Sequence, residues 1–86
     1  MNSQKKSNIE LAIIRRTIAV RKEKGLSQNN VAKMLDLTRG FIGQVESINS
    51  SSVYSLDHLN RLALKLNCSL HDFVPKDPII DSDSAG

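Results

Sequence analysis

Apolar residues recur at spacings of three and four through most of the chain, and residues that suit helix ends separate the runs. The first run contains Leu11, Ile14 and Ile18, and a Ser-x-x-Glu capping box that begins at Ser7 marks its start. Gly25 can adopt the left-handed conformation that ends a helix. The pattern therefore predicts a first helix that begins after Ser7 and ends near Gly25.

Two shorter segments with apolar residues at helical spacing follow, and each begins after a residue that commonly caps a helix. Ser27 precedes the run 28–35, and Thr38 precedes a run that extends to about Ser47. Asp36 lies between the two runs, at a turn that needs a positive φ, which Asp tolerates better than most residues. Two short helices joined by a tight turn are therefore predicted.

The second half of the chain repeats this helical pattern after a polar interruption. Residues 48–53 are rich in serine and lack periodicity, which predicts a connecting loop. Ser55 then caps a leucine-rich run of helical period that Asn67 can end, and Ser69 caps a short fifth helix that Pro75 stops. Because no segment shows strand-like alternation, the predicted class is all-α, with five helices in one compact domain.

Length and composition divide the chain into three parts. Residues 1–7 are expected to form a flexible N-terminal arm, residues 8–74 the folded domain, and residues 75–86 an acidic, disordered tail. Apolar residues make up 40% of the 86 residues and aromatic residues only 3%. This composition favours aliphatic packing between helices over an aromatic β-core.

The charge of the chain is unevenly distributed. The formal net charge is +3, and the segment from Pro75 onward carries one Lys and three Asp, so residues 1–74 carry +5. A basic domain suits a polyanionic partner such as nucleic acid. Lys5 and Lys6 can be interpreted as an arm that contacts DNA or as ordinary solvated charges, and a short charged terminus is more often solvated.

The sequence also indicates where in the cell the protein is located. Cys68 has no second cysteine with which to form a disulfide. The apolar run 11–14 is followed at once by Arg15, so it suits neither a signal peptide nor a membrane span. A cytoplasmic protein without membrane contact is expected.

The residues give little support for a catalytic site or a metal-binding site. Cys68 and His71 form a single Cys-x-x-His pair, with His58 and Asp72 nearby, but a structural zinc site needs paired ligand knuckles. A buried cysteine and surface histidines are the simpler interpretation. Since no nucleophile–base arrangement or phosphate-binding glycine loop is present either, the chain is predicted to be no enzyme and to hold no metal or cofactor.

The segment from Gly25 to Glu46 carries the most specific pattern in the chain. It resembles the Cro and phage-repressor (XRE-type) helix-turn-helix family, and the resemblance extends from Ile18 to Val74. The matching positions are Arg21-x-x-x-Gly25-Leu-Ser-Gln28, Val31-Ala32, Leu37-Thr38, Ile42, Val45-Glu46 and Ser69-Leu-x-x-Phe73. The resemblance implies a five-helix, lambda-repressor-like domain whose third helix enters the major groove of DNA.

Carried over position by position, the resemblance identifies candidate DNA contacts. The base-reading candidates are Arg39, Gly40, Gly43 and Gln44. Arg39 can pair bidentately with guanine and Gln44 with adenine, whereas the two glycines allow the backbone to approach the bases. The phosphate-contacting candidates lie at two helix starts and in the loop after the third helix: Ser27, Gln28, Thr38, Ser47, Asn49 and Ser51.

The same resemblance implies further roles and shows two departures. Arg21 and Glu46 are expected to form a partly buried ion pair, and Leu70, Phe73 and Val74 a dimer interface. The chain has Asp36 where the family usually has Gly, and Ser47-Ile48 where a basic residue and Gly are usual. The second departure predicts a different exit from the third helix.

Two functions fit these features. The leading prediction is a sequence-specific regulator of transcription that binds double-stranded DNA, represses, and acts as a homodimer on a palindromic operator. The alternative is a helix-turn-helix module that binds a protein, such as the antitoxin of a toxin–antitoxin pair. The apolar pair Ile79-Ile80 within the acidic tail favours the alternative.

Overall fold

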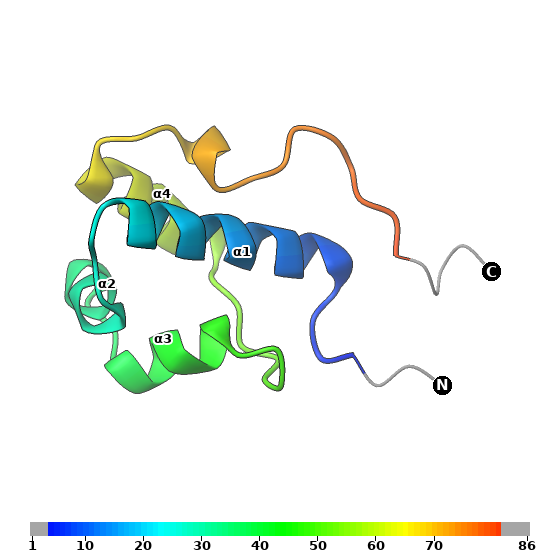
Figure 1. Cartoon of the computed structure of the whole chain (residues 1–86), viewed down its shortest axis with the longest axis horizontal. Coiled ribbons are helices and arrows are strands. Elements are labelled where there is room, and N and C mark those ends of the chain that lie inside the picture. Colours follow the sequence, from blue (N-terminus) through cyan, green and yellow to red (C-terminus); the bar gives the residue numbers. More distant parts are fainter. Residues whose placement is uncertain (1–3, 82–86) are drawn as a thin grey trace.

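The fold is entirely helical in this computed structural model, which describes residues 4–81 (Figure 1). Its elements are α1 (Asn8–Glu23), α2 (Gln28–Leu35), α3 (Arg39–Glu46), α4 (Leu56–Leu66) and the 3-10 turn η1 (Leu70–Asp72). Within the described residues there is no strand, so the all-α class is confirmed. The predicted fifth helix is corrected to a single 3-10 turn, because Ser69 and Asp72 cap each other across it and Pro75 cannot continue it.

Local capping explains where the helices begin and end. Serine side chains accept from the backbone N–H three residues later at the starts of α1, α2 and α4, and Thr38 does the same at α3. Asp36 (φ 58°) and Asn67 (φ 54°) adopt the left-handed conformation that ends α2 and α4. Gly25, with φ 71°, follows α1 in the same region.

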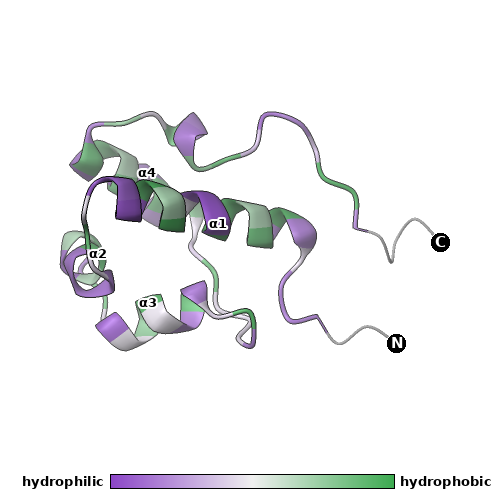
Figure 2. Cartoon of the chain, in the orientation of Figure 1, coloured by the Kyte–Doolittle hydropathy of each residue, from purple (hydrophilic) through white to green (hydrophobic). Residues whose placement is uncertain are grey.

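The helices form two layers around one apolar core. In Figure 1, α1 crosses the middle, α4 and η1 lie on one side of it, and α3 lies on the other. The helix α2 closes one end, where it packs against both α3 and α4. The buried residues of the core are Ile14, Val31, Ala32, Leu35, Ile42, Val45, Tyr54, Leu59, Leu62, Ala63 and Phe73. Figure 2 shows the resulting division of the helices into apolar and polar faces.

The position of Phe73 differs from the sequence prediction. Its side chain is fully buried, with 0% exposure, because η1 contacts both α1 and α4 and directs the following residue into the core. Phe73 therefore fills this chain's own interior and is not available to a second copy. Leu70, in contrast, is 40% exposed.

Each end of the described range, residues 4–81, has a contact with the helical domain. Lys6 is buried, which differs from the flexible arm and the solvated lysine that the sequence suggests. At the other end, Asp81 Oδ1 accepts from the backbone N–H of Asn8 at 2.8 Å, so the tail as far as Asp81 returns to the start of α1. The carboxylate suits this position because the first N–H groups of a helix carry partial positive charge.

A desolvated ion pair ties the end of α1 to the end of α3. Arg21 Nε and Nη2 donate to the two carboxylate oxygens of Glu46, each at 2.9 Å, and the two side chains are 13% and 8% exposed. Arg21 Nη1 donates to the carbonyl of Leu26, and Gln28 Nε2 donates to Glu46 Oε1, each at 2.9 Å. This geometry supplies the bidentate pairing and extra hydrogen bonds that a buried pair needs.

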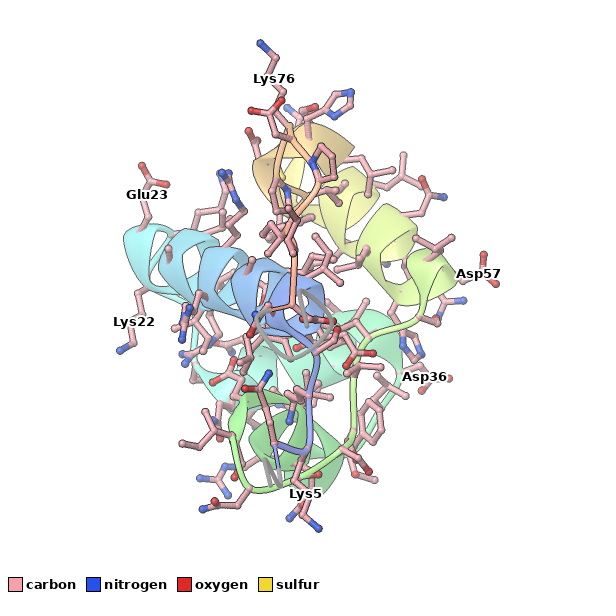
Figure 3. The ribbon with its side chains drawn as sticks, turned by 90° about the vertical axis from the view of Figure 1, so that its right-hand side faces the viewer. Lys5, Lys22, Glu23, Asp36, Asp57 and Lys76 are labelled. Atoms are coloured by element: carbon pink, nitrogen blue, oxygen red, sulfur yellow. The ribbon has the colours of Figure 1, made fainter. Side chains whose placement is uncertain are left out.

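Glu46→Ala is expected to destabilise the fold by about 3–5 kcal/mol, because it leaves the buried Arg21 without its counter-charge. Glu23→Ala is the control, since Glu23 is exposed and points away from the domain (Figure 3); a change within about 0.5 kcal/mol is expected there. Chemical denaturation measures both free energies of unfolding. Equal, small effects of the two substitutions would show that the pair adds no stability.

Candidate nucleic-acid interface

The outer face of α3 presents all four base-reading candidates together. Ile42 and Val45 attach α3 to the core, both with 0% exposure. Arg39, Gly40 and Gln44 are exposed and Gly43 is half-buried. At about 100° per residue the four candidates span an arc of about 140°, on the side away from the two core residues. The structure thus brings the predicted reading set to one surface, at the edge of the molecule in Figure 1.

The fold itself does not require the two glycines of this face. A Cβ atom at Gly43 would lie 3.9 Å from Gln28 Oε1, and one at Gly40 would lie 3.9 Å from Thr38 Oγ1, both ordinary van der Waals distances. Neither glycine has a positive φ. Glycine in a helix costs about 1 kcal/mol relative to alanine, so the bare backbone at these positions is better explained by a close approach from outside.

The turn between α2 and α3 sets the angle between the two helices. Ala32 is 1% exposed at the contact, and its small side chain permits close packing of the axes. Asp36 bends the chain in the left-handed conformation, and the N–H of Leu37 donates to the carbonyl of Ala32 at 2.8 Å. Thr38 then starts α3 at once. Two short helices packed across such a turn are the helix-turn-helix arrangement.

Several phosphate candidates also stabilise the fold. The hydroxyl oxygens of Ser27, Thr38 and Ser47 accept from the backbone N–H groups of Asn30, Phe41 and Asn49. A hydroxyl that accepts still has its own hydrogen to donate, so an outer oxygen such as that of a phosphate can bind there. Asn49 and Ser51 are exposed in the loop after α3.

Gln28 has a partner that the sequence pattern did not suggest. Its Nε2 donates to Glu46 Oε1, so the side chain is part of the α1–α3 ion-pair network and is half-buried. One of its two amide hydrogens is used in this way. The role is not visible in the sequence because the two positions are 18 residues apart and give no local signal.

Burial changes the acid–base properties of residues beside this network. Desolvation raises the pKa of Tyr54 well above its ordinary value, and the negative charge of Glu46 adds to the effect. The same cause raises the pKa of the Cys68 thiol, which disfavours the thiolate that would bind a metal.

Among residues 4–81, no three His, Cys, Asp or Glu side chains come together as a possible metal site. No helix in that range is long and apolar enough to span a bilayer.

Comparison with known proteins agrees with this geometry. The sequence pattern of the helix-turn-helix family matches residues 18–73, which is more than half of the chain. A solved structure with a similar fold is the crystal structure of a transcriptional regulator from Listeria innocua, with a TM-score of 0.63 and 19% sequence identity. The match covers 85% of this chain and 66% of that one, so the chain spans just under two thirds of that regulator's length. No curated protein sequence matches the chain.

The matched range begins within α1 and ends after η1. It therefore contains the ion pair, the turn at Asp36 and the whole of α3. The chain belongs to the helix-turn-helix family, in its Cro and phage-repressor (XRE) type.

Proposed function

We propose that this protein is a sequence-specific repressor that acts in the cytoplasm as a homodimer on a palindromic operator, with α3 in the major groove. The observation that carries the proposal is the outer face of α3, where exposed Arg39 and Gln44 flank two glycines on a helix held from beneath by Ile42 and Val45. A helix presented in this way reaches base edges without rearrangement of the core.

Arg39 and Gln44 carry the sequence readout in this proposal. The guanidinium group of Arg39 matches the two acceptors of guanine, and the amide of Gln44 matches the donor and acceptor of adenine. Since the two residues lie at opposite ends of the reading arc, they contact different base pairs. Gly40 and Gly43 between them allow the backbone to lie close to the groove floor.

The phosphate contacts lie on both sides of α3. Ser27 caps α2 and Gln28 is its first residue, and the start of a helix attracts anions. The exposed residues Asn49 and Ser51 belong to the loop that leaves α3. These contacts orient the domain on the DNA, and the formal charge of +5 on residues 1–74 attracts it there.

One observation favours the alternative function, in which the chain also binds a protein. Ile80 is 77% exposed and Ile79 is 38% exposed in the acidic segment that returns to α1. A partner protein that covered these two side chains would remove their apolar surface from water. A complex with a partner protein that survives at high salt would favour this antitoxin-like role, because DNA binding weakens steeply with salt.

Arg39→Ala and Gln44→Ala are expected to weaken binding to the preferred operator by about 1–3 kcal/mol each, and to change binding to scrambled DNA much less. The operator is first selected from random DNA.

Lys22→Ala is the matched control for the charge lost at Arg39, because Lys22 is exposed on α1 (Figure 3). Ser51→Ala removes a proposed phosphate contact and should weaken binding to operator and scrambled DNA alike. Equal losses on both DNAs for Arg39→Ala and Gln44→Ala would contradict readout by α3.

Gly43→Ala separates stability from DNA binding. The substitution should stabilise the fold by up to about 1 kcal/mol, because alanine favours a helix and the added Cβ meets only an ordinary contact. Operator affinity should nevertheless fall, since the methyl group keeps the backbone away from the bases. Thermal melting and an operator titration measure the two effects. Unchanged operator affinity would mean that the backbone of α3 does not approach the DNA at this position.

The dimer should form through the apolar end of the domain. Leu70 is 40% exposed and Leu64, near the end of α4, is 74% exposed; Val74 is half-buried beyond them. Leu64→Glu is expected to shift the sedimenting species from dimer to monomer at micromolar concentration. Leu56→Glu is the control, because Leu56 is 78% exposed at the opposite end of α4. A wild-type protein that binds a palindromic site as a strict monomer would refute the dimer.

A further inference from the structure

Lys6 is buried beside the end of α3, although lysine is among the residues least often found inside a protein. Its exposed fraction is 2%. Its neighbour Lys5 is exposed and extends from the molecule in Figure 3. The two adjacent lysines therefore have opposite environments, and the DNA-binding face described above leaves the buried one without a role.

The ammonium group of Lys6 lies among three backbone carbonyl oxygens. Nζ donates to the carbonyls of Gln44, at 3.4 Å, and of Ser47 and Ser50. An ammonium group has three hydrogens to donate and no acceptor, so these contacts use its whole capacity. The carbonyls belong to the last turn of α3 and to the loop that follows it.

This contact supplies a charge that α3 itself lacks. The last carbonyls of a helix have no partner within the helix and carry partial negative charge. The last turn of α3 contains no basic residue, and residues 47–52 after it contain none either. Lys6 thus provides, from a distant part of the chain, the cation at the end of α3.

The position of Lys6 is fixed by contacts on either side of it. Gln4 Nε2 donates to the carbonyl of Lys6, and the hydroxyl of Ser7 caps α1. The next residue, Asn8, donates its backbone N–H to Asp81. The segment before α1 is therefore held at several points.

Burial works against the charge at this site, and nearby polar groups offset that cost. Desolvation lowers the pKa of the Lys6 ammonium group, and the nearby carboxylate of Glu10 opposes that effect. Burial of a charge is tolerated when hydrogen bonds replace water around it, which the three carbonyls do here.

We propose that Lys6 is a positioning residue for DNA binding, which holds the end of α3 and the loop 47–52 in the shape that meets the DNA backbone. The inference rests on the proposed function and adds a residue to it. Because its ammonium group is buried, Lys6 acts through the loop and does not itself contact a phosphate. The exposed Lys5 lacks this role.

Lys6→Met tests the proposal against Lys5→Met, which removes the same charge from an exposed neighbour. Operator affinity should fall about tenfold for Lys6→Met, which corresponds to about 1.4 kcal/mol, and less than about twofold for Lys5→Met at the same salt concentration. The slope of log K against log salt should stay at the wild-type value for Lys6→Met, because no phosphate contact is lost. A slope smaller by about one would identify Lys6 as a phosphate contact and overturn the proposal.

Hydrogen exchange of the free protein tests the positioning role without DNA. The amides of Asn49, Ser50 and Ser52, which are hydrogen-bonded within the loop, should exchange faster in Lys6→Met, while the amides of α4 keep their rates. Lys6→Gln, which retains two donors on a neutral side chain, replaces Lys6→Met if that variant does not fold, and should show a smaller change in the same direction.

The outcomes distinguish the role of Lys6 from the proposed function of the protein. Unchanged loop exchange, or faster exchange with wild-type operator affinity, would overturn the role of Lys6 alone. Failure of the wild-type protein to select any DNA sequence would overturn the proposed function instead. Faster loop exchange together with weaker operator binding supports the proposal.

Discussion

The carboxylate of Glu46 joins three helices, and the orientation of α3 depends on it. Arg21 in the last turn of α1 and Gln28 in the first turn of α2 both donate to this single side chain at the end of α3. Arg21 also donates to the carbonyl of Leu26 between α1 and α2. Because the group is mostly shielded from water, loss of one partner leaves the others with unsatisfied hydrogen bonds. A network of this kind permits one arrangement of the three helices and penalises others.

In the proposed function, the reading helix α3 is fixed before DNA arrives. Thr38 caps the start of α3, Ile42 and Val45 anchor its inner side, and Glu46 and Lys6 hold its end. A surface that is already ordered loses little conformational entropy on binding, so more of the contact energy is available for affinity. The stabilising contacts lie beneath and behind α3, which leaves its outer face free for the base contacts of the proposed function.

The helix boundaries were predictable because capping is a local interaction. Ser7, Ser27, Thr38 and Ser55 each bond to a backbone N–H three residues away, so a short stretch of sequence contains the whole signal. The same applies to the left-handed turn at Asp36. The prediction was wrong for the fifth helix, because cap, turn and stop signals crowd into the few residues between Ser69 and Pro75, and these accommodate only one 3-10 turn.

The helical class, the ends of α1 to α4, the family and the residues that share the outer face of α3 could all be predicted from the sequence, because periodicity and capping act within a few residues. Four placements depend on packing instead: Lys6 is buried under the loop, Phe73 fills the core, Gln28 belongs to the ion-pair network and Asp81 returns to α1. Each of these contacts joins positions far apart in the chain. A lysine or an aspartate near a terminus is normally solvated, and only the packed neighbours of each residue change that outcome.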